Sequence, residues 1–167
     1  MNSRIGILRK IRANFSSFEE VWLFIQIFLL VAVLPLMLKL LSIPRLMKVL
    51  TPSKFKVYKN QESAKSKDKI VKFVDYILGR NLWIYKSTCL KRSLVLYHFL
   101  KRSGIRVHVC FGVRYKEELR TVDAKRLGGH AWLLYNGNVF LEKNTEIAKT
   151  YKMTYCFPDI SAIASET

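Results

Sequence analysis

The apolar positions of the N-terminal third of the chain concentrate in one segment, residues 21–43, which has only three polar interruptions. Its length matches the roughly 20 residues that a helix needs to cross the hydrocarbon core of a membrane. However, the uninterrupted apolar run covers only residues 27–38 and contains Pro35, as is typical of helices buried in protein or lying at a membrane interface. No small-residue cleavage site follows, which argues against a removable signal peptide. We predict an apolar helical region over residues 1–50, with membrane association left open.

A polar stretch rich in Pro, Ser, Lys, Asn and Gln covers residues 51–67. Such a composition buries too little apolar surface to order itself strongly. We therefore predict that residues 51–67 are a linker and that residues 68–167 form a globular domain. At 167 residues, the chain is long enough for one such domain with a real core.

Two helices are predicted at the start of this domain. Apolar residues recur at helical spacing over residues 70–78, which indicates a helix that ends near Gly79. An aromatic connector, residues 82–85, leads to a second helix that starts at about Cys89 and stops at Gly104. Cys89 is thus expected at the N-terminus of a helix.

The rest of the domain shows the two-residue alternation of strands, interrupted by a polar loop over residues 115–127. The dipeptide Asn136-Gly137 accepts positive φ and predicts a tight antiparallel hairpin. Helices followed by antiparallel strands indicate an α+β fold. The predicted strands cover residues 105–114, 130–135, 138–142 and 150–157.

The chain carries a formal net charge of +17, which concentrates anionic partners around it. Nucleic acid, acidic lipid headgroups and an acidic peptide would all satisfy this field. The basic residues are scattered over all elements, and no known nucleic-acid-binding motif occurs, so nucleic acid is the least favoured of the three partners. An anionic membrane surface remains a candidate partner.

The three cysteines, Cys89, Cys110 and Cys156, are odd in number and show no C-x-x-C spacing. A chain of this size does not need a disulfide framework, so we expect free thiols and a reducing, cytoplasmic location. Cys110 lies in an apolar strand, where a cysteine is commonly a small buried hydrophobe. Cys156 has no predicted partner.

Cys89 is the candidate nucleophile. A thiol attacks carbonyl groups as the thiolate, and its pKa falls at a helix N-terminus or beside an imidazolium. Ser87 and Thr88 precede Cys89 as candidate helix caps. The first-turn amides would stabilise negative charge on sulfur, and they could form part of an oxyanion hole.

His130 is the candidate general base. It follows Gly128-Gly129 and opens a predicted strand, so that backbone could approach its ring closely. Glu142, at the far end of the hairpin, could accept a hydrogen bond from the second ring nitrogen and hold the tautomer, as the third member of a catalytic triad does. Helix-borne Cys, strand-borne His and a later acid is the order of the papain and transglutaminase architecture.

The register of the hairpin tests this assignment. With an ideal two-residue turn, His130 would pair with Lys143, and Glu142 would point to the opposite face of the sheet. We therefore predict an odd-numbered loop or a bulge, which would put Glu142 diagonal to His130 on one face. Asn144 is the fallback, because an amide can also orient a histidine.

A zinc site is a rival interpretation of the same residue types. Cys89, His108, Cys110 and His130 could supply ligands, but His-x-Cys on a strand lacks the usual spacing of paired zinc ligands. We expect no bound metal or cofactor, and the pattern says nothing about nucleotide dependence. His98, in the middle of a helix, is expected to be a core or surface residue.

The motifs around these residues resemble those of the leader peptidases of lasso-peptide biosynthesis, a branch of the transglutaminase-like superfamily of the microcin-processing type. The resemblance covers roughly residues 70–145. Glu142 departs from the family, whose usual acid at that position is Asp. The motifs that carry the resemblance are Cys89-Leu90-Lys91-Arg92-Ser93-Leu94, Phe111-Gly112-Val113-Arg114 and Gly129-His130-Ala131-Trp132.

This resemblance implies a papain/transglutaminase-like core in which the nucleophile helix packs on an antiparallel sheet. It implies that Cys89, His130 and Glu142 are catalytic, and Trp83 and Trp132 are further candidates for substrate contact. The implied reaction removes the leader from a ribosomally synthesised precursor peptide. The implied partners are that precursor, a separate leader-recognition protein and a ring-closing, amidotransferase-like cyclase.

Two alternatives to a peptidase remain open. A transglutaminase-like amidase or acyltransferase would keep the triad but change the group that attacks the thioester. A basic, non-catalytic adaptor attached to a membrane through residues 21–43 would not use Cys89 at all.

Overall fold

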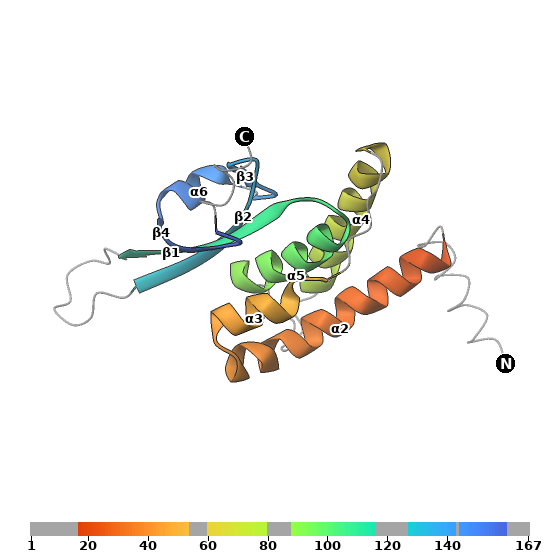
Figure 1. Cartoon of the computed structure of the whole chain (residues 1–167), viewed down its shortest axis with the longest axis horizontal. Helices are drawn as coiled ribbons and strands as arrows, with labels where there is room; N and C mark the ends of the chain where they lie inside the picture. Colours follow the sequence, from red (N-terminus) through yellow and green to blue (C-terminus); the bar gives the residue numbers. More distant parts are fainter. Residues whose placement is uncertain (1–16, 54–59, 80–87, 116–126, 143, 160–167) are drawn as a thin grey trace.

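The computed structural model contains a four-stranded antiparallel sheet with the order β3-β2-β1-β4. Helix α5 lies against one face of the sheet, α2 and α3 lie beyond α5, and α6 lies on the other side (Figure 1). The elements are α2 (Phe18–Leu40), α3 (Ile43–Leu50), α4 (Asn60–Gly79), α5 (Cys89–Arg102), β1 (Val107–Tyr115), β2 (Leu127–Tyr135), β3 (Asn138–Phe140), α6 (Thr145–Lys149) and β4 (Lys152–Phe157). The structure describes residues 17–53, 60–79, 88–115, 127–142 and 144–159.

The predicted α+β fold, with a helix starting at Cys89 and packed on an antiparallel sheet, is confirmed. The Thr88 side chain caps α5 by accepting a hydrogen bond from the Lys91 amide at 3.2 Å. Gly104 follows the helix with φ +80, a conformation that glycine adopts without steric cost. Helix α5 therefore begins at a side-chain cap and ends at a glycine.

The alternation of β1 and β2 divides the sheet side chains between two environments. Val109 and Leu133 belong to the main core that α5 shares with the sheet. Cys110 and Trp132, one position along each strand, pack with Ala148 of α6 in a smaller cluster. Because side chains alternate across a strand, the two clusters lie on opposite faces of the sheet.

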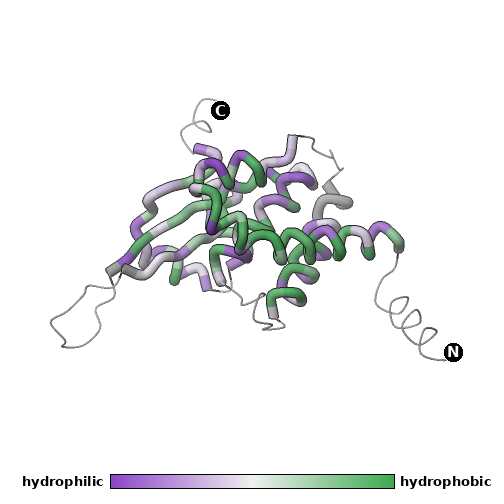
Figure 2. The backbone as a smooth tube through the Cα atoms, turned by 90° about the horizontal axis from the view of Figure 1, so that it is seen from below, coloured by the Kyte–Doolittle hydropathy of each residue, from purple (hydrophilic) through white to green (hydrophobic). Residues whose placement is uncertain are grey.

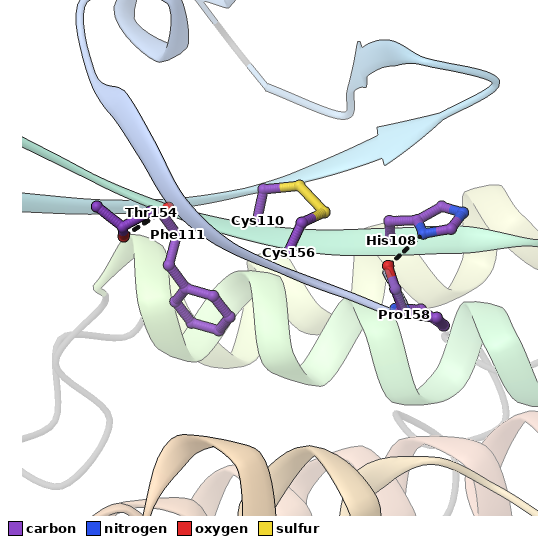
Figure 3. Close-up of a disulfide and its surroundings, with 6 residues drawn as sticks. All are labelled: His108, Cys110, Phe111, Thr154, Cys156 and Pro158. Atoms are coloured by element: carbon purple, nitrogen blue, oxygen red, sulfur yellow. Dashed lines mark hydrogen bonds between the residues drawn. A yellow bond between two sulfur atoms is a disulfide. The ribbon is translucent and has the colours of Figure 1, made fainter. Parts of the chain in front are cut away.

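The expectation of three free thiols is wrong for two of them. Cys110 and Cys156 form a disulfide between the adjacent strands β1 and β4, on the face of the sheet away from α5 (Figure 3). They occupy directly paired positions in the antiparallel ladder, so their side chains point to the same face. Strand pairing between segments 46 residues apart cannot be read from cysteine spacing, which is why the prediction missed it. Cys89 is the free cysteine of the described residues.

The predicted linker over residues 51–67 is partly helical, because α4 begins at Asn60 instead of near residue 68. Its first turns contain Gln, Glu, Ala and Lys, which are strong helix formers although they bury little apolar surface. The end of this helix at Gly79 agrees with the prediction. The short helix α6 was not predicted, and the aromatic connector over residues 82–85 lies outside the described residues.

Helix α2 contains most of the apolar N-terminal segment and is long and apolar enough to cross a membrane. It continues through Pro35 and packs on the domain through Ile27, Val31 and Leu34, which are fully buried. These three residues belong to the same core cluster as α4, α5 and the sheet. Helix α2 therefore packs as part of the fold.

Candidate functional site

Cys89 is the first residue of α5, and its thiol is free and partly exposed. The Thr88 hydroxyl satisfies the amide of Lys91. The earlier amides of a helix have no helical carbonyl to accept them, and they give its N-terminus a partial positive charge. The predicted position of Cys89 at the N-terminus of a helix is confirmed.

His130 lies in β2 opposite Gly112 of β1, and its side chain is only 12% exposed. Its Nε2 lies 3.8 Å from Oε1 of Glu142, whose side chain is 17% exposed. This separation is longer than a hydrogen bond, and Nε2 has no hydrogen-bond partner among the described residues. The carboxylate thus faces Nε2, which leaves Nδ1 as the nitrogen that could accept a proton from a thiol.

The hairpin that carries His130 and Glu142 differs from the prediction. Tyr135 pairs with Asn138, so the turn has two residues, Asn136 and Gly137, both with positive φ. The prediction of an odd-numbered loop or a bulge in this hairpin is wrong. Regular pairing would have carried Glu142 to the opposite face.

What brings Glu142 to His130 is the early end of the strand. β3 stops at Phe140, and Leu141 then adopts φ +59, which turns the chain out of the strand direction. Glu142 follows this turn and reaches Nε2 of His130. Asn144 was the alternative residue for orienting His130. Its side chain instead caps α6, where it accepts a hydrogen bond from the Glu146 amide at 3.1 Å.

Arg92 connects this turn to the helix that begins with Cys89. Its Nη1 donates to the carbonyl oxygen of Leu141 at 2.7 Å. Its Nε and Nη2 donate to the two carboxylate oxygens of Asp75 in α4, at 2.7 and 3.2 Å. The guanidinium therefore fixes the residue before Glu142 against α4 and the first turn of α5.

A second contact joins α5 to β2 beside His130. Ser93 lies one helical turn after Cys89, on the same side of α5, and its hydroxyl donates to the carbonyl oxygen of Ala131 at 2.9 Å. The Ser93 side chain is buried. The helix turn that carries the thiol is thus held at the level of His130 along β2.

The imidazole and α5 lie on different sides of the β2 backbone. His130 packs with Trp132 and Tyr151 on the α6 side, whereas Ala131 and Leu133 face α5. β3 pairs only with residues 133–135 of β2, so at His130 the ladder to β3 has already ended.

Trp132, a candidate for substrate contact, lies beside the histidine on β2. It is only 5% exposed, and its ring is stacked on that of His130 with centroids 5.9 Å apart. A Cβ added at Gly112 would lie 2.8 Å from Cη2 of Trp132, so the indole fills the space beside the glycine. The other candidate, Trp83, lies outside the described residues.

The glycine that matters for close approach is Gly112, whereas the sequence pointed to Gly128-Gly129. A Cβ added at Gly129 would meet no atom within 4 Å. Gly129 therefore imposes no steric requirement beside His130, and the tight contact comes from the neighbouring strand.

The zinc interpretation is wrong. Cys110 is bonded to Cys156, and Nδ1 of His108 is 2.9 Å from the carbonyl oxygen of Pro158 (Figure 3). Within the part of the chain that the structure describes, no group of three or more His, Cys, Asp or Glu side chains could hold a metal ion. His98 is partly buried, with Nδ1 2.7 Å from the carbonyl oxygen of Leu50.

Three site residues were not singled out from the sequence: Arg92, Asp75 and Tyr151. Arg92 stands in the quoted motif that begins with Cys89, but the motif alone did not indicate its role. The Tyr151 ring lies 5.1 Å from that of His130, and nothing in the local pattern indicates this contact. Asp75 lies on a different helix, so only the three-dimensional packing relates it to the site.

A comparison with known protein families matches residues 30–154 to the transglutaminase-like superfamily. The match covers more than half of the chain and includes Cys89, His130 and Glu142. Searches of curated proteins and of solved structures find no significant match.

Proposed function

Because the chain belongs to the transglutaminase-like superfamily, whose members are generally catalytic, we propose that it is a cysteine peptidase with Cys89 as its nucleophile. In this proposal His130 accepts the thiol proton and Glu142 orients the imidazole. The observation that carries it is the connection of the His130–Glu142 pair to the start of α5 through Arg92 and Leu141.

The reaction would proceed by acyl transfer to sulfur. The Cys89 thiolate attacks a peptide carbonyl, and the first-turn amides of α5 stabilise the oxyanion. The His130 imidazolium then gives its proton to the leaving amine as the C–N bond breaks, which leaves a thioester. Water attacks the thioester while His130 takes its proton, and the carboxylic acid and the free thiol are released.

We propose that the substrate is the leader of a ribosomally synthesised precursor in lasso-peptide maturation. The support is the resemblance of the motifs around Cys89 and His130, and the net charge of +17 suits an acidic peptide. A separate leader-recognition protein would present the precursor, and the amine freed by cleavage would be the substrate of a ring-closing cyclase. No bound cofactor enters the proposed chemistry.

The test uses the purified full chain with a precursor peptide and its leader-recognition protein, and it follows release of the leader by mass spectrometry. We expect Cys89→Ala and His130→Ala each to abolish cleavage, because the two residues act as one nucleophilic unit. His108→Ala is the matched control, since it also removes a histidine from a strand, and it should leave cleavage in place. Circular dichroism checks that each variant is folded.

Cleavage retained in Cys89→Ala would overturn the proposal. An added amine distinguishes a peptidase from an acyltransferase. If the product that carries the amine on the acyl group exceeds the hydrolysed product, the chain is an acyltransferase and not a peptidase. If the biological role persists in Cys89→Ala, the adaptor interpretation would replace both.

A further inference from the structure

An apolar stripe follows the outer face of α2 along its full length. Its residues recur every three or four positions, so they share one face of the helix. Their exposed fractions run from 40% at Ile25 to 83% at Phe18. At 1.5 Å per residue, the stripe is roughly 33 Å long. The α2 stripe consists of Phe18, Trp22, Ile25, Leu29, Val33, Leu36 and Leu40.

Seen from the α2 side, the helix is hydrophobic over most of its length (Figure 2). An exposed apolar surface this long and continuous is unusual for a soluble monomer and marks an interaction site. Val49 of α3, 61% exposed, lies shortly after the end of the stripe in the chain. We therefore expect a binding partner to cover this surface.

The opposite face of α2 is attached to the domain. Gln26 accepts a hydrogen bond from Nη1 of Arg102 at 2.8 Å, and Glu20 pairs with Lys69 of α4. Beyond these polar contacts along the helix, Ile27 and Val31 are fully buried in the core. One side of α2 therefore packs against α4 and α5, and the other side is exposed.

This attachment argues against a membrane span. If α2 crossed a bilayer while docked, the Arg102 guanidinium and the end of α5 would enter the hydrocarbon with it. A charged side chain at the centre of a bilayer is costly, and α5 carries a second base, Lys101, in its last turn. An orientation with α2 lying flat in the interface keeps Arg102 on the aqueous side.

Basic residues lie beside the C-terminal end of the stripe, and others precede the stripe in the sequence. Lys39, Arg45 and Lys48 are exposed beside its C-terminal end. The chain before α2 contains Arg4, Arg9, Lys10 and Arg12. An apolar face of aliphatic residues with a Trp and a Phe, accompanied by bases, is the composition of a helix that binds anionic lipid headgroups. A net charge of +17 opposes docking of a second copy on the same face.

We propose that the α2 stripe docks on an anionic lipid bilayer, with the helix lying in the plane of the interface. The apolar side chains enter the headgroup and acyl boundary, and the flanking bases contact lipid phosphates. The sheet that carries His130 lies on the side of α5 away from α2, so membrane docking leaves that region facing water (Figure 1). This inference is independent of the proposed peptidase activity.

The experiment measures flotation of the purified full chain with vesicles of phosphatidylcholine, with and without phosphatidylglycerol. The chain should bind the anionic vesicles, and binding should weaken as salt is raised. The triple variant Leu29→Gln, Val33→Gln and Leu36→Gln should lower the partition coefficient at least about tenfold. The double variant Arg45→Gln and Lys48→Gln should reduce binding to anionic vesicles only.

The matched control is the double variant Ile147→Gln and Met153→Gln. It removes apolar side chains that are 43% and 48% exposed on α6 and β4, and it should bind as the unchanged chain does. Thermal unfolding verifies that the variants fold. Equal loss of binding in this control would overturn the proposal, because the effect would then not belong to α2.

Three further results would overturn it. Resistance of the membrane-bound chain to alkaline carbonate extraction would replace docking with a span. Loss of residues 1–40 from the mature protein in cells would make α2 a signal sequence. A stable dimer in solution that the α2 triple variant dissociates, together with no vesicle binding, would assign the stripe to a second copy of the chain.

Discussion

Arg92 donates a hydrogen bond to the carbonyl oxygen of Leu141 at 2.7 Å, at the point where the chain turns out of β3 with φ +59. A leucine in the left-handed region costs roughly 1–2 kcal/mol and persists where its surroundings enforce it. The fork of Arg92, anchored on Asp75, supplies that enforcement. Arg92 is thus a positioning residue for Glu142, which follows the turn.

We predict that Arg92→Lys lowers both stability and activity. A lysine cannot reach the Asp75 carboxylate and the Leu141 carbonyl together, so the free energy of unfolding should fall by about 1–3 kcal/mol. Leader cleavage should fall in kcat more than it changes KM, because the turn before Glu142 loosens while the substrate surface is unchanged. Denaturant unfolding and steady-state kinetics measure the two effects.

Arg102→Lys is the control for that variant, since it also weakens an arginine hydrogen bond of α5, to Gln26, away from the site. It should reduce stability and leave kcat close to that of the unchanged chain. If both variants lose kcat in proportion to stability, Arg92 has only a structural role.

We predict that Glu142→Gln reduces kcat by about 100-fold or more, as loss of the orienting acid does in related triads. The amide preserves size but removes the charge that faces Nε2 of His130 at 3.8 Å. Glu142→Asp should retain more activity, because it keeps the carboxylate. Glu146→Gln, on an exposed residue of α6, is the control. Full activity in Glu142→Gln would remove Glu142 from the mechanism.

We predict that Gly112→Ala displaces Trp132 and lowers activity. The added methyl would lie 2.8 Å from Cη2 and 2.9 Å from Cζ3 of Trp132, and 3.0 Å from the carbonyl oxygen of Lys152. Since the indole is stacked on His130, its displacement should disturb the imidazole. Forced overpacking of this kind costs typically about 1–3 kcal/mol.

Gly129→Ala is the matched control, because its Cβ would meet no atom within 4 Å although it adjoins His130. Tryptophan fluorescence and cleavage rates should change in Gly112→Ala and stay unchanged in Gly129→Ala. Equal effects of the two substitutions would mean that Trp132 does not support the histidine.

The elements around the site could be predicted because their signals are local. The apolar spacing and Gly104 bounded α5, and Asn136-Gly137 predicted the hairpin, although not its two-residue turn. The position of Glu142 could not be predicted, because it depends on Leu141 leaving the strand. That departure is stabilised by Arg92, 49 residues earlier in the chain.

The disulfide and the packing of α2 were missed for the same reason. Cys110 contacts Cys156 because β4 pairs with β1, and the spacing of the cysteines in the sequence does not indicate that pairing. In α2, the apolar residues that enter the core and those that stay exposed have the same character. The sequence pattern could not show that Ile27 is buried while Leu29 is 55% exposed. Gln26, which binds Arg102, was the one local sign of a protein-facing side.

His98 leads to a prediction about acid stability. Burial lowers the pKa of His98 from its ordinary value of 6.5, the hydrogen bond to the Leu50 carbonyl opposes this shift, and the positive charge of Arg102 adds to it. The folded chain therefore binds a proton at His98 more weakly than the unfolded chain does. Stability from this residue is complete above pH 6.5 and is lost as the pH falls below that value, with a slope of at most about 1.4 kcal/mol per pH unit.

We predict that His98→Asn flattens this dependence, since an asparagine amide can donate to the Leu50 carbonyl without titrating. The measurement compares free energies of unfolding for the unchanged chain and the variant between pH 7.5 and pH 5. His108→Asn, which alters a histidine bonded to the Pro158 carbonyl instead, should keep the slope that belongs to His98. If the slope is the same in the unchanged chain and in His98→Asn, the acid sensitivity arises elsewhere, and the contact between α3 and α5 does not titrate.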